Sequence, residues 1–370
     1  MGASYYAVSI AGQLRLSSED DPARVISLTI NDPDEAAATA SLTLDDKDGA
    51  IYLPQKNDPV SIILGRSKHG AQETFRGKVS NVTSSGGSGG RTLAVSADAA
   101  DLTGKAKQPL QKSWQNKTVK EILTDAAKEA GLQPPRIDEA IGKIMRVSEV
   151  ADGESYLEFA KRIAREVGGK SSLFDDLPVM IEANGGKSAS GRSLVPVDIV
   201  WSDQSPNLTG WSISPKQSRP AHSAFASRYF DFEKGEVIEV EAEGEKEAKA
   251  KARSSASLKA TKEEAEAAAK SDKEGAERAA GSGTITCDGN PSLFAGGLIN
   301  LKGARAGVDG QYRVKSCTHT LNASGYLCNL SIELPKGGAG KDTRKKQTSP
   351  QSSATQSSQL SGYGVTFGGV

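Results

Sequence analysis

The sequence lacks a net charge, a long apolar run and more than a few cysteines. Its 370 residues carry 46 basic and 46 acidic side chains, so no global field favours nucleic acid or an anionic membrane as a partner. No segment approaches the ~18 continuous apolar residues of a membrane span, and residues 1–20 lack a basic start followed by an apolar block. Cys287, Cys317 and Cys328 are too few and too widely spaced for a disulfide framework or a zinc knuckle. We expect synthesis in the cytosol.

The residue patterns of common catalytic sites are also missing. His69, His222 and His319 have no ligand or base partner at a helical spacing such as i, i+4. Gly87-Ser88-Gly89 is not followed by the helix that a nucleophile elbow requires. We therefore predict no catalytic residues, no metal ligands and no cofactor. A pair of carboxylates could still form a glycosidase site, because that chemistry needs only two acids at a set separation.

Residues 1–107 are predicted to form a β-barrel module. Tyr6, Val8 and Ile10 alternate with other residues, and the same spacing recurs over 60–64 and elsewhere. The stretch Ser84–Gly90 is nearly pure serine and glycine, which predicts a flexible hairpin loop. Alternating strands with one polar face favour a sandwich or a barrel.

Residues 108–170 change to a helical period and are predicted to form a small α/β insert. Thr118 and Glu121 have the spacing of a capping box, and so do Ser155 and Glu158. Apolar stripes at helical spacing follow both boxes. We expect two amphipathic helices that share one core.

The chain then returns to strands, and we predict a strand-rich connector over 171–209 and a second β-barrel module over 210–335. Trp201 and Trp211 could form a platform for a sugar, although a core or subunit-contact role fits their apolar neighbours better. Residues 239–280 are rich in Ala, Glu and Lys, which are good helix formers, so this stretch is predicted to be a helical excursion on the surface.

The last strands of the second module are predicted to form a hairpin between Tyr312 and Leu334. We expect a three-residue loop, Ala323-Ser324-Gly325, with Gly325 as a left-handed bulge residue. This register places Thr318 opposite Leu330, and Cys317 and Cys328 on opposite faces. A disulfide between those two thiols is then unfavourable.

The order of motifs in this region resembles that of the phage late control D family. Leu301-x-Gly303 is followed by Gly307-Val308-Asp309-Gly310-x-Tyr312-x-Val314, then His319-x-Leu321, Gly325-Tyr326 and a strand that ends at Glu333-Leu334. Members of that family are baseplate hubs of contractile phage tails. The resemblance implies a mainly β fold with an α+β insert, in which two tube-like β-barrel modules flank a small helix-containing domain.

The resemblance also implies a structural role rather than an enzymatic one. It implies a homotrimer in the virion baseplate that joins a six-fold tail tube to a three-fold central spike, synthesised in the host cytoplasm. The implied partners are the central spike protein and the tail tube or distal tube proteins, with the tape measure and baseplate wedge proteins as further candidates; nucleic acid and, in the resting particle, membrane are not implied. The alternative is a peptidoglycan-binding module built on 106–170 or a peptidoglycan-degrading tail component.

Residues 336–370 are predicted to be an extended arm that orders only on assembly. The arm has little apolar surface, and ordering each residue costs on the order of 1–2 kcal/mol of backbone entropy. We expect its last segment, Tyr363–Val370, to add as a strand to an exposed edge of a partner.

Overall fold

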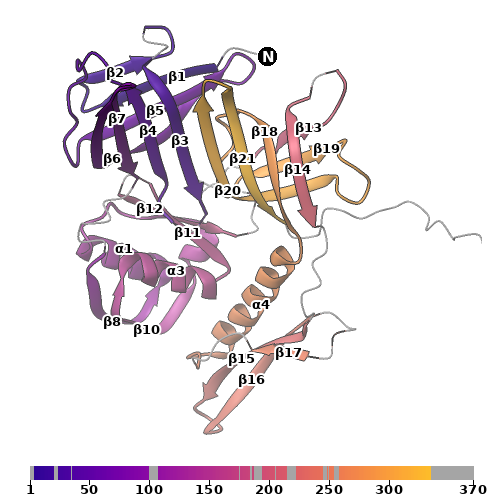
Figure 1. The fold of residues 1–370 in the computed structure, drawn as a ribbon. Coiled ribbons are helices and arrows are strands. Elements are labelled where there is room, and N and C mark those ends of the chain that lie inside the picture. Colours follow the sequence, from indigo (N-terminus) through magenta and orange to yellow (C-terminus); the bar gives the residue numbers. More distant parts are fainter. Residues whose placement is uncertain are drawn as a thin grey trace, which may run out of the picture.

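The protein is mainly β, and its long sheet curls into two half-barrels that lie above a small α/β insert and a helix (Figure 1). The computed structural model describes residues 4–334 apart from 21–23, 35, 100–106, 175, 184–185, 187–193, 205, 215–221, 245–247, 249 and 254–257. The predicted arm over 336–370 therefore lies outside the described residues. None of the described helices is long and apolar enough to cross a membrane.

The first module is an antiparallel sheet in the order β3-β4-β7-β6-β5-β1-β2. Its strands are β1 (Ser4–Ile10), β2 (Leu14–Ser17), β3 (Val25–Pro33), β4 (Thr39–Asp45), β5 (Pro59–Arg66), β6 (Gly70–Gly87) and β7 (Gly90–Asp98). Alternate side chains such as Val8, Ile10 and Ile62 are buried, as the predicted alternation requires. The predicted loop over Ser84–Gly90 is wrong, because β6 continues to Gly87 and only a two-residue turn remains.

The second module has the order β14-β18-β21-β20, followed by β19 and β13. Its strands are β13 (Val197–Val200), β14 (Leu208–Ser214), β18 (Ser282–Asp288), β19 (Leu298–Lys302), β20 (Gly310–Asn322) and β21 (Gly325–Glu333). Strand β20 joins the modules, because one of its edges pairs first with β19 over 310–313 and then with β3 over 316–322. The buried residues of both modules form one continuous hydrophobic core.

The two modules repeat the same arrangement of six strands. The sheet order β3-β4-β7-β6-β5-β1 corresponds to β14-β18-β21-β20-β19-β13, and the strands follow one another along the chain in the same sequence in both sets. The β6–β7 and β20–β21 hairpins both close with a two-residue loop. One pairing differs, since β1 is antiparallel to β5 whereas β13 is parallel to β19.

Irregular pairings recur at equivalent positions in both modules. The bulge of β6 at Val79–Asn81 corresponds to that of β20 at Val314–Ser316, the same number of residues before the hairpin. The bulge of β3 at Val25–Ser27 likewise corresponds to that of β14 at Leu208–Gly210. Bulges are specific features of a strand pair. The repeat therefore extends to the register of individual residues.

The insert has its own hydrophobic core and contains the predicted helices. Its elements are β8 (Pro109–Thr118), α1 (Val119–Glu129), β9 (Arg136–Ile137), α2 (Glu139–Gly142), β10 (Met145–Ser155), α3 (Tyr156–Glu166), β11 (Gly169–Phe174) and β12 (Leu177–Glu182). Both predicted capping boxes, at Thr118 and Ser155, are confirmed. Strands β11 and β12 pair with each other and β12 pairs with β9, so the insert's sheets extend past residue 170 into the predicted connector.

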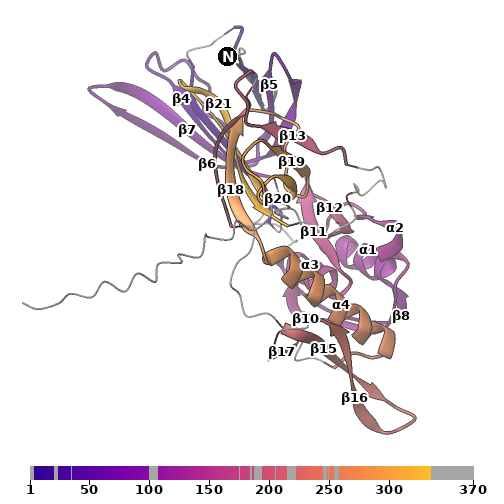
Figure 2. The ribbon, with the colours of Figure 1, turned by 90° about the vertical axis from the view of Figure 1, so that its right-hand side faces the viewer.

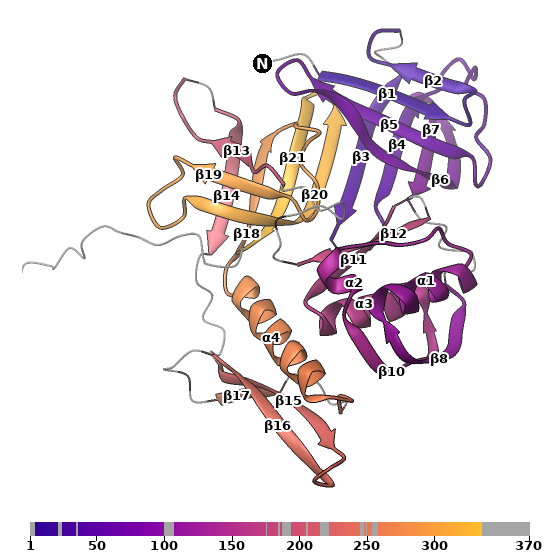
Figure 3. The same ribbon diagram turned by 180° about the vertical axis from the view of Figure 1, so that it is seen from behind.

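The predicted helical excursion over 239–280 is only partly helical. Three strands come first, β15 (His222–Asp231), β16 (Glu236–Glu243) and β17 (Ala250–Arg253), and α4 begins only at Lys262 and ends at Ala279. Ile238, Val240 and Ala242 alternate along β16 and turn their side chains toward one face, so the two-residue period outweighs the helical composition. Helix α4 packs on β15 and β16 rather than standing alone in solvent (Figure 3).

The predicted register of the last hairpin is wrong by one residue. Asn322 pairs with Gly325, so the loop is Ala323-Ser324, and Thr318 lies opposite Asn329 rather than Leu330. The bulge at Val314–Ser316 then moves the following side chains to the other face. Tyr312 is buried before the bulge and Cys317 after it, because a one-residue shift exchanges the two faces of a strand.

Candidate functional site

A buried group of charges lies at the seam where β20 leaves β19 and meets β3. The Arg313 guanidinium binds Asp34 through two contacts of 2.7 and 2.8 Å and binds the Glu333 carboxylate at 2.8 Å. Lys170 of β11 lies 3.4 Å from Asp34. Arg313 and Asp34 are 4% and 6% exposed. Since Arg313 comes from β20, Asp34 follows β3, Glu333 ends β21 and Lys170 belongs to the insert, this group ties both modules and the insert together.

The charges at the seam hold one another in their ionised forms. Burial alone would raise the pKa of Asp34, but hydrogen bonds and charge from Arg313, with Lys170, bring it below its ordinary value. Burial would lower the pKa of Arg313, and Asp34 and Glu333 raise it instead. A buried pair of this kind costs much free energy when one partner is removed.

A second buried group, on the inner face of β20 and β21, surrounds His319. The Tyr326 hydroxyl lies 2.7 Å from His319 Nδ1, and the Leu293 carbonyl oxygen lies 3.1 Å from Nε2. A carbonyl oxygen only accepts hydrogen bonds, so Nε2 carries a proton, and Nδ1 accepts a hydrogen bond that the Tyr326 hydroxyl donates. Cys317, His319 and Cys328 are the one group in the described part of the chain that could hold a metal ion, with ligand atoms within 4.8 Å of one another. The hydrogen bonds of both ring nitrogens account for the histidine without a metal.

The three cysteines gather in this same region. Cys287 lies directly opposite Cys328 on the neighbouring strand, Cys328 lies opposite His319, and all three thiols are buried and free. The prediction that Cys317 and Cys328 lie on opposite faces is therefore wrong, and its cause is the wrong hairpin register. A hydrogen bond to Cys328 and burial both raise the pKa of Cys317, which favours an unreactive thiol.

A pocket of about 590 Å³ opens beside His319, between the first module, the loop before β19 and the insert. Asp32 lines this pocket, and its carboxylate accepts the Ala295 N–H at 2.8 Å. Burial raises the pKa of Asp32 to about 6, against the opposing hydrogen bond from Ala295. Glu73 also lines the pocket, but Arg76 and Ser61 hold its carboxylate. These contacts are structural: Asp32 fixes a loop, and Glu73 belongs to a surface ion pair.

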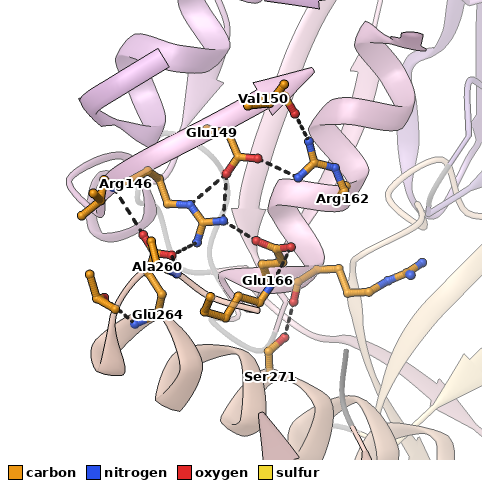
Figure 4. Close-up of polar contacts among 12 residues, drawn as sticks. Arg146, Glu149, Val150, Arg162, Glu166, Ala260, Glu264 and Ser271 are labelled. Carbon is orange, nitrogen blue, oxygen red and sulfur yellow. Dashed lines mark hydrogen bonds and ion pairs between the residues drawn. The ribbon is translucent and has the colours of Figure 1, made fainter. Parts of the chain in front are cut away.

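A third group of charges joins α4 to the insert (Figure 4). Arg146 of β10 binds Glu149 at 2.8 Å, contacts Glu166 of α3, and lies 3.7 Å from Glu264 of α4. Lys259, just before α4, binds Glu166 at 2.6 Å. Arg146 and Lys259 have side chains only 5% and 4% exposed. Buried ion pairs thus compensate for the few large apolar residues of α4.

Two exposed tryptophans lie on the second module. Trp201 and Trp211 are 49% and 37% exposed, and their rings meet edge-to-face with centroids 5.5 Å apart. This edge-to-face arrangement is not the flat platform of a sugar site, and their exposure rules out a core role. Their remaining predicted role, contact with another subunit, stays a prediction.

The histidines do not form a common site. His69 lies in an exposed turn after β5, His222 begins β15, and His319 lies in β20. The residues that sequence reasoning missed are the seam charges Asp34, Arg313 and Glu333. Arg313 lies between the apolar Tyr312 and Val314 in a buried strand, and a charge inside such a run is a signal for a buried partner.

The comparisons with known proteins agree with this architecture. The sequence model of the phage tail baseplate hub (GPD) family matches residues 38–325. No curated protein sequence matches the chain. The structure is similar to that of a 43 kDa tail protein of prophage MuSo2 from Shewanella oneidensis, with 15% identity over 89% of this chain and 98% of that chain and a TM-score of 0.65.

Two further solved structures share the fold. A tail protein from Neisseria meningitidis MC58 has 14% identity over 92% of this chain and 99% of that chain, with a TM-score of 0.65. An Escherichia coli protein described as a component of the type VI secretion system, with structural similarity to the T4 tail proteins gp27 and gp5, has 13% identity over 91% of this chain and 79% of that chain, with a TM-score of 0.57.

Proposed function

The chain belongs to the phage tail baseplate hub family, and from this premise we propose that it is a homotrimeric adaptor that joins a six-fold tail tube to a three-fold central spike in a contractile tail. In this role it is a structural component of the virion baseplate. The proposed partners are the central spike protein and the tail tube or distal tube proteins, with tape measure and wedge proteins as further contacts.

The observation that carries this proposal is the repeat of one six-strand module within the chain. The two modules join head to tail, because β3 at the end of the first pairs with β20 inside the second. Head-to-tail contacts form a closed ring when the rotation between units closes. Three chains with two equivalent modules each would present six similar units to a six-fold tube and three identical chains to a three-fold spike.

A mass measurement of the intact protein, alone and mixed with its spike, tests this proposal. The expected species is a trimer of the 38.7 kDa chain, and the expected complex contains three copies of the chain and one spike trimer. A protein that stays monomeric or dimeric, alone and with the spike, would contradict the adaptor role.

We assign no enzymatic activity to the chain. The acids that line the pocket beside His319 are engaged by the chain's own groups, Asp32 by the Ala295 N–H and Glu73 by Arg76. The alternative of a peptidoglycan-binding module gains no support from a particular observation. A pull-down with purified cell wall distinguishes that alternative from the adaptor.

A further inference from the structure

Several strand edges of the long sheet have no partner strand within the described residues, and two of them are β14 and the distal half of β6. Strand β14 ends the sheet and pairs on one side only, with β18. Strand β6 pairs with β5 only as far as Lys78, so its last residues have β7 on one side and no strand on the other. The β6–β7 hairpin projects from the sheet as a ribbon (Figure 2). Open edges of this kind are templates for pairing with another chain.

The repeat shows which partner fits each edge. Strand β14 is the counterpart of β3, and β6 is the counterpart of β20. Within the chain, β3 and the distal half of β20 pair with each other over 27–33 and 316–322. The open edges of β14 and β6 therefore correspond to the edges of β3 and β20 that pair with each other. Neither open edge has such a partner within the described residues.

We propose that β14 of one copy pairs antiparallel with the distal half of β6 in a second copy, and that this contact closes the ring of modules. The proposal rests on the trimeric adaptor function and names its subunit interface. The register follows from the β3–β20 pairs His319 with Ile30, Thr320 with Thr29, and Leu321 with Leu28. It places Ser84 opposite Ile213, Ser85 opposite Ser212, and Gly86 opposite Trp211.

The side chains of the two edges suit this register. Leu28 of β3 is fully buried next to β20, whereas its counterpart Trp211 is 37% exposed. The residue opposite Trp211 is Gly86, which adds no side chain, so the indole has room to lie across the ribbon. Pairing would bury Trp211 and remove its exposed apolar surface from water.

The backbone of the β6 edge also points the right way. Gly87 and Gly90 flank a two-residue hairpin loop and form a hydrogen-bonded pair. Because the direction alternates along a strand, the backbone N–H and C=O groups of Ser84 and Gly86 point away from β7. In β20 the backbone N–H and C=O groups at the equivalent positions face β3. The Lys315 carbonyl belongs to the same set of alternate residues and accepts the Asp34 N–H at 3.0 Å. The Ser84 and Gly86 amides and carbonyls are thus positioned to bond to β14 of a neighbour.

Cysteine cross-linking of the trimer tests the register. Ser85 and Ser212 lie opposite each other in a pair that is not hydrogen-bonded, where side chains are closest, so the Ser85→Cys/Ser212→Cys variant should form a covalent trimer on mild oxidation. The matched positive control is Thr29→Cys/Thr320→Cys, which is the equivalent pair within one chain and should form an intrachain bond. In the negative control, Ser84→Cys/Ser212→Cys, the side chains lie on opposite faces. The natural cysteines are buried and contribute little background.

A trimer that does not cross-link through Ser85 and Ser212, while the intrachain control does, overturns this interface and leaves the adaptor function standing. The absence of any trimer, alone or with the spike, overturns both.

A second variant measures the backbone contact. Ser84→Pro removes one outward N–H, which an edge strand tolerates within a single chain, and should weaken trimer formation at least about tenfold relative to Ser84→Ala. Equal trimer formation by these two variants contradicts the proposal. If Ser84→Pro does not fold, the Ser85→Cys/Ser212→Cys cross-link is the measurement that tests the interface.

Discussion

Replacement of Arg313 by methionine should destabilise the protein more than replacement of any exposed arginine. The guanidinium satisfies Asp34 and Glu333, whose side chains are 6% and 12% exposed, and Lys170 at 3.4 Å is the remaining cation beside Asp34. Loss of one partner of a buried ion pair costs about 3–5 kcal/mol, because the other charge stays buried without compensation. Arg313→Met should therefore lower the free energy of unfolding by about 3–5 kcal/mol.

Arg76→Met is the matched control, since Arg76 also binds a carboxylate in a β-strand, that of Glu73, but is 60% exposed. Exposed ion pairs contribute about 0–1 kcal/mol. Urea unfolding followed by tryptophan fluorescence compares both variants with the natural protein, and Trp201 and Trp211 report on the second module. A loss below 1 kcal/mol for Arg313→Met, equal to that of Arg76→Met, would refute the assigned role of the seam.

The Arg313–Asp34 ion pair also predicts how the stability of the protein depends on pH. The folded-state pKa of Asp34 is lower than its ordinary value, so its contribution to stability is present above about pH 4 and is lost as the pH falls through the folded pKa. The difference in stability between the natural protein and Arg313→Met should therefore shrink below about pH 4. A difference that stays constant from pH 7 to pH 3 would contradict this account.

Four further outcomes follow from the structure and the sequence. Because the folded-state pKa of Asp32 is raised to about 6, ionisation costs stability as the pH rises from 4 to 7, so Asp32→Asn should stabilise the protein by up to about 3 kcal/mol at pH 8 but not at pH 4 in urea unfolding. Lys259→Met leaves Glu166 with Arg146 alone and should speed amide hydrogen exchange in α4 before the barrel modules are affected. Purified protein should not clear a peptidoglycan zymogram; clearing that is lost when one buried acid is changed to its amide would contradict this. A chain truncated after Lys336 should fold but assemble poorly, and assembly at full yield would exclude the predicted role of the arm.

Local patterns in the sequence were enough to predict elements but not how strands align. The capping boxes at Thr118 and Ser155 located two helices, because a capping box depends on side chains three residues apart. The register of the last hairpin depends instead on the length of its loop, which is two residues rather than three, and the faces of β20 change at the bulge near Lys315, which leaves no local mark in the sequence. Once the register was wrong, Cys317 was assigned to the wrong face, and the cluster around His319 could not be predicted.

The seam charges show a second limit of sequence reasoning. Asp34 and Arg313 are 279 residues apart, and their contact depends on the pairing of β3 with β20. A buried arginine in an apolar strand indicates that a partner exists, but 46 acidic residues are available. Only the topology of the sheet selects Asp34.

The internal repeat was hidden for a related reason: the backbone is preserved in the two modules while most side chains differ. Asn57 and Gly296 occupy equivalent positions before β5 and β19, both with positive φ, and each donates its N–H at 2.8 Å to the carbonyl of the residue that precedes the bulge, Val79 or Val314. Asparagine and glycine are the residues that tolerate a positive φ best. Both modules therefore keep a residue of this kind at the position, although the residue itself differs.

The differences between the two modules lie where their neighbours differ. The inward positions of β20 near its hairpin carry Cys317, His319 and Leu321, which pack in the core that β3 closes. The equivalents of His319 and Leu321 in β6 are Ser84 and Gly86, which are exposed, and no described strand pairs with this edge of β6. Small polar residues suit an unpaired edge, since an apolar edge would pair with any strand it met. The composition that predicted a loop over Ser84–Gly87 therefore also suits the edge that we propose pairs with a second copy.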